Sequence, residues 1–349
     1  MNEHPHQIGA YAQGAPAGAQ RRDLRKFLAR MLALAALVVA GHAVILAMPS
    51  EKGSYLSAVI DKQARLRSLA SPKLVFVGGS NLSFALDSPR IEHEMGMPVA
   101  NMGLGIYAGL RFMLDSVVSR LGPGDLVVIS AEYQLYRGLY NGEDELLEVL
   151  EAFPDGLRTV DWKAQALPLA RALPTFIKNK TNRMLAMLVQ KSDPRCVYCR
   201  KAFNQYGDLV ALDGQPGKDV ATMALFRSKS EQGPIEGDAI RGLRRFVAAA
   251  TERGARVVLM FPAVPLPLYE KNREKIEEVY ERVKKDVPVP VLGSPSENTM
   301  PAQYFWDWVY HLVPAGRDIR TGVVLERLKN YLASSPSSAA SAAVPRRAG

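Results

Sequence analysis

The chain has 349 residues and a net charge of +9, and 48% of its residues are hydrophobic. This apolar fraction is typical of a globular protein and too low for a polytopic membrane protein. Despite the positive net charge, we predict no nucleic-acid partner. Part of this charge lies in a basic cluster between Arg21 and Arg30 and in a tail that holds Arg346 and Arg347. The other basic residues are mixed with acidic ones, as on solvated helix faces.

An apolar segment follows the basic cluster. From Met31 to Met48 the only strongly polar residue is His42. A helix of this length spans about 27 Å, close to the thickness of the hydrocarbon core of a bilayer. We therefore predict a disordered basic cytoplasmic tail over residues 1–26 and one membrane-spanning anchor over residues 27–48.

The positive-inside rule places the basic tail in the cytoplasm and everything after the span outside it. This predicts a single-pass protein of the inner (cytoplasmic) membrane whose main domain is periplasmic or extracellular. The alternative is a cleaved signal peptide. The long basic region and the poor small-residue pattern near Ala47 favour an uncleaved anchor.

The first predicted strand ends in a small polar motif. Residues 49–72 are expected to form a membrane-proximal helix, and Leu74–Val77 is an apolar run typical of a buried parallel strand. Two glycines end this strand, and Ser80 and Asn81 follow. Open α/β sheets bind ligands at the carboxyl ends of their strands. Ser80 is therefore a candidate site residue, with a plain strand-to-helix turn capped by serine as the alternative.

The rest of the chain repeats a strand and helix pattern. Further strands are expected near residues 98–103, 126–130, 255–261 and 287–292, and helices near residues 107–121, 236–253, 267–286 and 314–332. We predict an α/β domain over residues 73–332, preceded by the transmembrane helix. Its expected architecture is a flavodoxin-like three-layer α/β/α sandwich with a mostly parallel five-stranded sheet.

Two stretches depart from this pattern. Residues 136–232 combine helical patterns near 143–152 and 162–190 with a polar loop, and we expect them to form an insertion in the sheet domain. Residues 333–349 are rich in Ser, Ala and Pro and are expected to be a disordered tail.

A serine nucleophile needs a base within hydrogen-bonding reach and a group that orients the base. Beyond residue 93 the only histidine is His311, and Asp307 lies just before it. Both follow the last predicted strand, so the topology would bring them to the sheet edge that carries Ser80. The alternatives are a satisfied core histidine and a turn aspartate.

The candidate residues and their order along the chain resemble the SGNH or GDSL-like hydrolase superfamily. Ser80 after the first strand, Gly103 after the second, and Asp307 and His311 before the last helix match the blocks of that family. The resemblance implies catalysis by Ser80, His311 and Asp307 through an acyl-Ser80 intermediate. It also implies an oxyanion hole made by the backbone N–H groups of Ser80 and Gly103.

The match has departures. Asn81 and Asn101 lie in matched blocks and are counted among the oxyanion or substrate residues, but the aspartate that the family has before its serine is Gly79 here. The family's third-block asparagine is replaced by Glu132, with Gln134 nearby as another donor. An ionised Glu132 would repel an oxyanion, whereas a protonated one could donate to it or bind a sugar hydroxyl. Three residues, where the family usually has two, separate the acid from the histidine. An inactive, binding-only domain therefore stays open.

The anchor and the Gly-Ser-Asn variant resemble a narrower group within that superfamily. Its members are membrane-anchored, face outward and accompany membrane O-acyltransferases, as the alginate acetylation proteins and the teichoic-acid D-alanylation protein do. This resemblance implies an esterase or O-acyltransferase, for example an O-acetyltransferase, that acts on a cell-surface polysaccharide. The alternative is a catalytically inactive carbohydrate-binding or scaffold partner of a membrane-bound O-acyltransferase.

Cys196 and Cys199 are the two cysteines of the chain. A zinc site would lack two nearby ligands, and a thioredoxin-like motif would follow a strand, whereas Ser-Asp-Pro precedes this pair. Outside the cytoplasm, a local disulfide that ties the insertion is the favoured interpretation.

Cofactor motifs give no match. The glycines from Gly103 to Gly109 come close to the dinucleotide-binding fingerprint, but their spacing has one residue too many and no acidic residue follows at the required distance. The chain contains no P-loop and no Gly-x-Ser-x-Gly elbow. We predict no cofactor and no metal site.

Overall fold

The computed structural model describes residues 17–48, 52–189, 196–212, 214, 216–218 and 220–334. They fall into two compact units that divide after Pro49. Most of the two tails predicted to be disordered, residues 1–16 and 335–349, lies outside the described residues.

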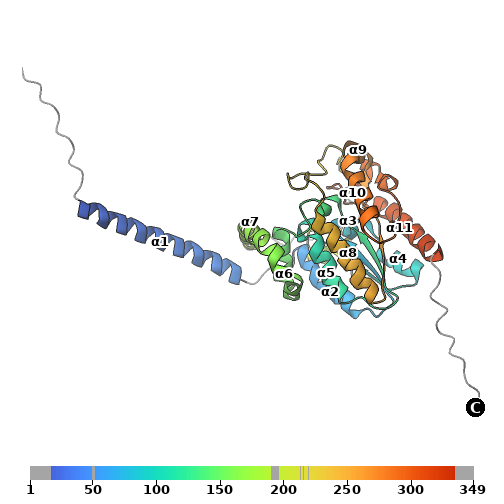
Figure 1. Cartoon of the computed structure of the whole chain (residues 1–349), viewed down its shortest axis with the longest axis horizontal. Coiled ribbons are helices and arrows are strands. Elements are labelled where there is room, and N and C mark those ends of the chain that lie inside the picture. The colour runs from blue at the N-terminus through green and yellow to red at the C-terminus, as the bar shows by residue number, and fades with distance from the viewer. Residues whose placement is uncertain are drawn as a thin grey trace, which may run out of the picture. The chain divides into compact units, whose positions relative to one another are not determined.

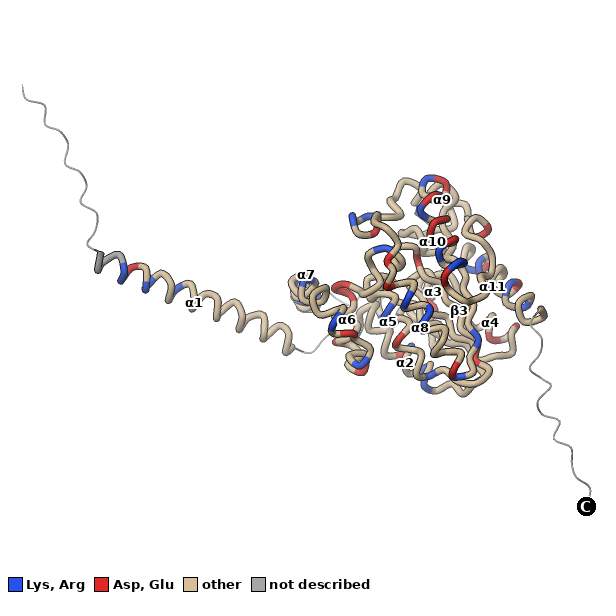
Figure 2. Tube along the Cα trace, viewed as in Figure 1, with Lys and Arg blue, Asp and Glu red and all other residues tan. Residues whose placement is uncertain are grey.

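The N-terminal unit contains one helix, α1 (Ala17–Ala47). Its segment Arg21–Ala47 is long and apolar enough to cross a membrane by length and composition. Figure 2 shows charged residues at the start of α1 and none along the rest of it. The helix begins at Ala17 and not at residue 27, so the prediction of a disordered tail is wrong for residues 17–26. Arg, Leu, Lys and Gln are good helix formers, and their run continues into the apolar segment without a break.

The second unit is built on a parallel sheet of four strands (Figure 1). Its strands are β1 (Leu74–Gly78), β2 (Val99–Asn101), β3 (Leu126–Ser130) and β4 (Arg256–Leu259). They lie in the order β2-β1-β3-β4. All residues of β1 and β3 are buried, as expected for a parallel sheet covered on both faces.

The predicted fifth strand is reduced to one bridge. Val291 pairs with Leu259 in parallel, but residues 287–292 form no continuous strand. Pro288 and Pro290 lack the N–H group that a strand needs to extend its ladder, so the prediction of a five-stranded sheet is wrong. A separate short sheet pairs β5 (Val264–Pro265) with β6 (Thr299–Met300) in parallel.

Helices cover both faces of the four-stranded sheet. Strand side chains alternate between the faces, and two apolar clusters result, one around Val75 and Val127 and one around Phe76 and Val128. The first cluster includes side chains of α2 (Val59–Ser68), α5 (Leu110–Val118), α8 (Gly237–Glu252) and α10 (Arg273–Asp286). The second includes side chains of α3 (Ser80–Ala85) and α11 (Pro314–Ser334), and Ile91 of α4 (Ser88–Met95).

Two predicted helices are divided in the structure. Gly109 has a φ of +86°, a left-handed value, and separates the short 3-10 helix η2 (Ile106–Ala108) from α5. Asn272 separates α9 (Leu266–Lys271) from α10. After β1, helix α3 begins at Ser80 itself.

The predicted insertion packs within the same compact unit as the sheet. It contains α6 (Asp144–Ala152) and α7 (Trp162–Val189), and α6 packs against α7, η2 and the 3-10 helix η1 (Leu56–Ala58). The remaining 3-10 helices are η3 (Tyr133–Tyr136), η4 (Pro154–Thr159), η5 (Arg200–Ala202), η6 (Ser296–Asn298) and η7 (Ala302–Tyr304).

A buried ion pair joins the chain segments that enter β1 and β3. Lys73 Nζ lies 2.7 Å from Asp125 Oδ2, and both side chains are almost fully buried. Asp125 also accepts the backbone N–H groups of Lys73 and Gly122. The pair therefore fixes the starts of the two central strands.

We expect Asp125→Ala to lower the free energy of unfolding by about 3–5 kcal/mol, because it leaves the Lys73 charge buried and unpaired. The measurement is urea unfolding of the full chain in detergent. Asp238→Ala is the control, since it removes an exposed partner of Arg241 and should change stability by less than about 1 kcal/mol. Equal effects of the two substitutions would contradict the role of the buried pair.

Candidate active site

Ser80 lies at the carboxyl end of β1 and is the first residue of α3. The chain turns through Gly78 and Gly79, and neither position has room for a side chain. A Cβ atom at Gly79 would lie 2.1 Å from Glu132 Oε2, and one at Gly78 would lie 2.0 Å from the Ser130 carbonyl oxygen. The two glycines therefore let β3 and its following loop approach the turn closely enough to hold Ser80 in place.

His311 comes to Ser80 from a tight loop before α11. This loop is closed by hydrogen bonds between the backbones of Trp306, Trp308 and His311. His311 Nε2 lies 3.0 Å from Ser80 Oγ, and the Phe84 ring stacks on the imidazole with ring centroids 3.8 Å apart. The imidazole is thus held between the Phe84 ring and the Ser80 hydroxyl group.

Asp307 completes a chain of hydrogen bonds. Its Oδ1 lies 2.9 Å from His311 Nδ1. Because a carboxylate accepts, we assign the proton to Nδ1, which leaves the Nε2 lone pair for the proton of Ser80. The arrangement has the components of a nucleophile, a base and an orienting acid.

Burial sets the protonation of this pair. It lowers the pKa of His311 and outweighs the opposing effect of Asp307, so the imidazole is neutral at pH 7. Burial alone would raise the pKa of Asp307, but hydrogen bonds from His311 and Tyr198 outweigh it and hold this pKa below its usual value. A neutral imidazole beside a carboxylate is the state required of a general base.

The three side chains line a cavity of about 500 Å³. This volume is in the range of sites for small molecules. Residues from several elements complete its lining, and they are Ser54, Tyr55, Leu56, Gly105, Ile106, Tyr107, Glu145, Glu148, Arg183, Tyr198, Arg227 and Trp308. The cavity therefore extends from Ser80 to α6 and α7 of the insertion.

Gly103 and Asn101 do not line this cavity. The Gly103 N–H donates to Asn101 Oδ1 at 3.0 Å, and the Asn101 side chain donates to Leu82 O and Asp208. The prediction that Gly103 supplies an oxyanion donor is therefore wrong, because its N–H is already used in a turn closed by Asn101. Asn101 is fully buried and orders this turn.

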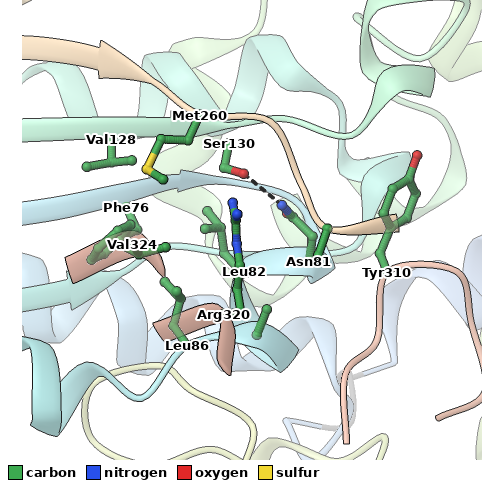
Figure 3. Close-up of a pocket in the computed structure, with 12 residues that line it drawn as sticks. Phe76, Asn81, Leu82, Leu86, Val128, Ser130, Met260, Tyr310, Arg320 and Val324 are labelled. Carbon is green, nitrogen blue, oxygen red and sulfur yellow. Dashed lines mark hydrogen bonds between the residues drawn. The ribbon is translucent and has the colours of Figure 1, made fainter. Parts of the chain in front are cut away.

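Asn81 and Gln134 also point away from the cavity. Asn81 Nδ2 donates to Ser130 Oγ at 2.9 Å, in the packed region shown in Figure 3. The Gln134 side chain donates to Leu225 O and accepts from the Tyr310 hydroxyl. The predicted role of Gln134 as an oxyanion donor is wrong, since both ends of its amide are bound within the core.

Glu132 is fully buried and does not line the cavity. Its Oε1 accepts the Asn81 N–H at 2.9 Å, so the carboxyl group holds the first turn of α3. Burial raises the pKa of Glu132 to about 7 against the lowering effect of hydrogen bonds from the backbone. Its contacts place it in support of the Ser80 turn and not against a substrate.

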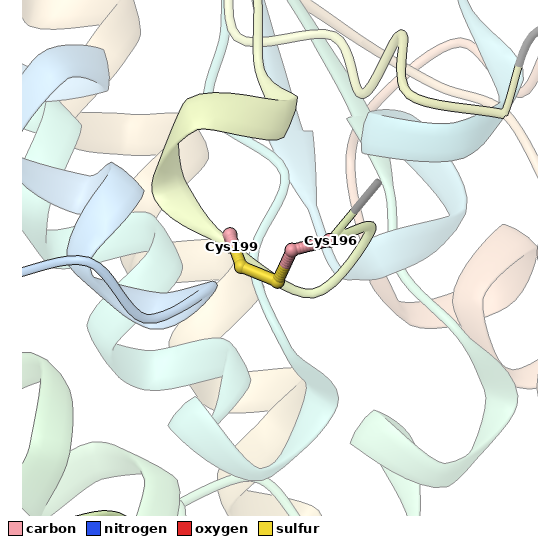
Figure 4. Close-up of a disulfide and its surroundings, with 2 residues drawn as sticks. All are labelled: Cys196 and Cys199. Atoms are coloured by element: carbon pink, nitrogen blue, oxygen red, sulfur yellow. A yellow bond between two sulfur atoms is a disulfide. The ribbon is translucent and has the colours of Figure 1, made fainter. Parts of the chain in front are cut away.

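Tyr198 and Glu145 are two of the cavity residues that the sequence did not predict. Tyr198 lies between two cysteines that the structure joins in a disulfide, Cys196–Cys199 (Figure 4), and its hydroxyl donates to Asp307. Its position inside the CxxC motif was the available signal. Glu145 of α6 accepts the Tyr107 N–H, and burial raises the pKa of Glu145 to about 8. Nothing in its local sequence distinguishes it from a solvated helix residue.

No group of three or more His, Cys, Asp or Glu side chains that could hold a metal ion occurs among the described residues. No family model matches the chain, and no curated protein does. Among solved structures, the chain is similar to the crystal structure of protein YXIM from Bacillus subtilis, with 11% sequence identity and a TM-score of 0.36. The match covers 76% of this chain and 58% of that one. This likeness is too slight to bear on activity or substrate.

The raised pKa of Glu132 makes stability depend on pH. The folded protein binds this proton more tightly than the unfolded chain, whose pKa lies near the ordinary 4.5. The contribution of Glu132 to stability is therefore lost as the pH rises from about 4.5 to about 7. Glu132→Gln removes this titration.

We expect the stability of Glu132→Gln relative to the wild type to increase by about 2–3 kcal/mol between pH 5 and pH 8. The measurement is urea unfolding of both proteins at the two pH values, and the difference between them cancels all other titrations. A pH-independent difference would mean that Glu132 has an ordinary pKa in the folded protein.

Proposed function

We propose that this protein is a membrane-anchored serine esterase or O-acyltransferase of SGNH type that acts on a cell-surface polysaccharide. Its nucleophile is Ser80, its general base is His311, and Asp307 orients the base. The observation that carries this proposal is the continuous hydrogen-bond chain from Ser80 Oγ through the imidazole to Asp307, on the wall of a cavity of about 500 Å³.

In the first step, Ser80 Oγ attacks the acyl carbonyl carbon of the substrate while its proton passes to His311 Nε2. The imidazolium that forms is stabilised by Asp307. His311 then returns the proton to the leaving oxygen as the C–O bond breaks, which leaves an ester of Ser80. In the second step, His311 accepts a proton from water or from a sugar hydroxyl while the attacking oxygen bonds to the acyl carbon. The ester bond to Ser80 then breaks, and His311 returns the proton to Ser80 Oγ.

The oxyanion donors differ from the expected set. Of the N–H groups at the start of α3, that of Asn81 donates to Glu132 and that of Leu82 donates to the Gly79 carbonyl oxygen. We assign the N–H of Ser80 as the first donor. Gly105 also lines the cavity, and we assign its N–H as the second donor, in place of that of Gly103.

The location and substrate class rest on α1 and on the sequence resemblance. One apolar helix near the N-terminus, with basic residues at its start, supports a single-pass anchor with its N-terminus in the cytoplasm and the site in the periplasm or outside the cell. A membrane-bound O-acyltransferase would supply the acyl group, and the polysaccharide would receive or lose it. In this scheme, water as acceptor gives an esterase, and a sugar hydroxyl gives a transferase.

The first test is hydrolysis of p-nitrophenyl acetate together with labelling by a fluorophosphonate. We expect Ser80→Ala and His311→Ala each to lower the rate at least about 100-fold, because serine, base and oxyanion donors act as a unit. The wild type should bind the phosphonate covalently at Ser80 with loss of fluoride. Ser119→Ala, an exposed serine at the end of α5, is the matched control and should behave as the wild type.

Equal hydrolysis and no labelling in the wild type and Ser80→Ala would favour the carbohydrate-binding scaffold. The same variants should be compared in cells by the acyl content of the surface polysaccharide. A scaffold would keep that content in Ser80→Ala, whereas an enzyme would change it.

A second test follows from the lowered pKa of His311. The base works only as the neutral imidazole, so activity is lost when His311 is protonated. Because burial places its pKa below the ordinary 6.5, kcat/KM for p-nitrophenyl acetate should rise with pH through a midpoint below 6.5 and then level off. A midpoint at or above 7 would show that another group, such as Glu132 or Glu145, controls the reaction.

A further inference from the structure

We propose that Tyr198, held in place by the Cys196–Cys199 disulfide, is a positioning residue that orients Asp307 toward His311. This inference rests on the proposed function, because it concerns the same hydrogen-bond chain. Tyr198 then becomes the fourth residue of the hydrogen-bond chain, after Ser80, His311 and Asp307, and the disulfide has a role in the site.

The contacts of Asp307 carry the inference. Its Oδ1 faces His311 Nδ1 at 2.9 Å, and its Oδ2 accepts the Tyr198 hydroxyl at 2.5 Å. With each oxygen bound by a different residue, the carboxylate cannot rotate without breaking a hydrogen bond. The Tyr198 hydroxyl also lies 3.3 Å from His311 Nδ1, so it closes a triangle around the Asp307–His311 pair.

Tyr198 stays a donor over the working pH range. Burial, and then the nearby Asp307, raise the pKa of its phenol above the ordinary value. Hydrogen bonds to charged groups are stronger than those between neutral groups, so the contact can hold a partly exposed carboxylate.

Ring contacts and the disulfide together keep Tyr198 in this position. Tyr198 is 46% exposed, and its ring contacts the rings of Tyr55, Phe84 and Trp306. On its C-terminal side, Cys199 pairs with Ser54 in a β-bridge, and Arg200 binds both carboxylate oxygens of Asp61. The disulfide ties Cys196 to this anchored point with a Cα–Cα distance of 5.7 Å. Tyr198 is therefore held between two fixed ends of a four-residue loop.

A role in binding the substrate is the main alternative, because Tyr198 also lines the cavity. The two roles use different parts of the side chain. Positioning needs the hydroxyl, whereas stacking on a substrate needs the ring. Tyr198→Phe removes the first and keeps the second.

The experiment uses the full chain in detergent and p-nitrophenyl acetate as substrate. We expect Tyr198→Phe to lower kcat roughly 10- to 100-fold with KM unchanged, because a hydrogen bond to a charged group is lost. The acidic limb of its profile of kcat/KM against pH should move to higher pH. Without the Tyr198 hydroxyl, Asp307 stabilises the charged form of His311 more strongly and raises its pKa. Tyr206→Phe is the matched control. It removes a tyrosine hydroxyl that donates to Glu92 away from the cavity, and it should change neither kcat nor the position of the acidic limb.

The disulfide is tested with the double substitution of Cys196→Ser and Cys199→Ser, and by treating the wild type with a phosphine reductant that opens it to two thiols. Both should lower kcat, but by no more than Tyr198→Phe does. Adding Tyr198→Phe to the double substitution should cost little more, because all act through one hydrogen bond. Circular dichroism checks that each variant is folded.

Wild-type kcat and an unmoved acidic limb in Tyr198→Phe would overturn the positioning role, as would a change confined to KM. An unchanged kcat in the reduced wild type would overturn the role of the disulfide. The protonation midpoint of His311, followed by NMR with labelled histidine, gives a readout that needs no turnover. If the wild type neither hydrolyses the ester nor binds the fluorophosphonate, the proposed function fails, and the NMR midpoint in Tyr198→Phe still decides whether Tyr198 acts on His311.

Discussion

The close approach of the end of β3 to the turn after β1 is the constraint on which the site depends. Gly78 and Gly79 leave no side chain in the turn, so the Ser130 carbonyl and the Glu132 carboxyl group lie where Cβ atoms would otherwise be. Glu132 then accepts the Asn81 N–H and fixes the start of α3. Ser80 stands at the first position of that helix, and its direction follows from this contact.

Segments far apart in the sequence meet at this turn. Ser80 comes from the end of the first strand, His311 and Asp307 from the loop before the last helix, and Tyr198 from the predicted insertion. The parallel sheet makes the meeting possible, because the carboxyl ends of its strands open on one edge. In the insertion, the disulfide closes the short loop that carries Tyr198.

The carboxyl group of Glu132 lies in the space beside Gly79. It comes from the residues that follow β3, and a Cβ atom at position 79 would lie 2.1 Å from its Oε2. The burial of that group has a cost, which appears as its raised pKa. A side chain at position 79 and the Glu132 carboxyl group therefore exclude each other sterically.

The sequence by itself determined the α/β class, the start of the sheet at Leu74, the apolar N-terminal helix and the choice of Ser80, Asp307 and His311 as candidates. These follow from local patterns, since strand runs, breakers and the scarcity of histidine can be read along the chain. The tertiary structure alone decided that Gly103 and Gln134 are bound elsewhere, that residues 287–292 add one bridge and not a strand, and that Tyr198 reaches Asp307. Those outcomes depend on which donor meets which acceptor in the packed fold, and such pairings over long sequence separations leave no periodic signal in the sequence.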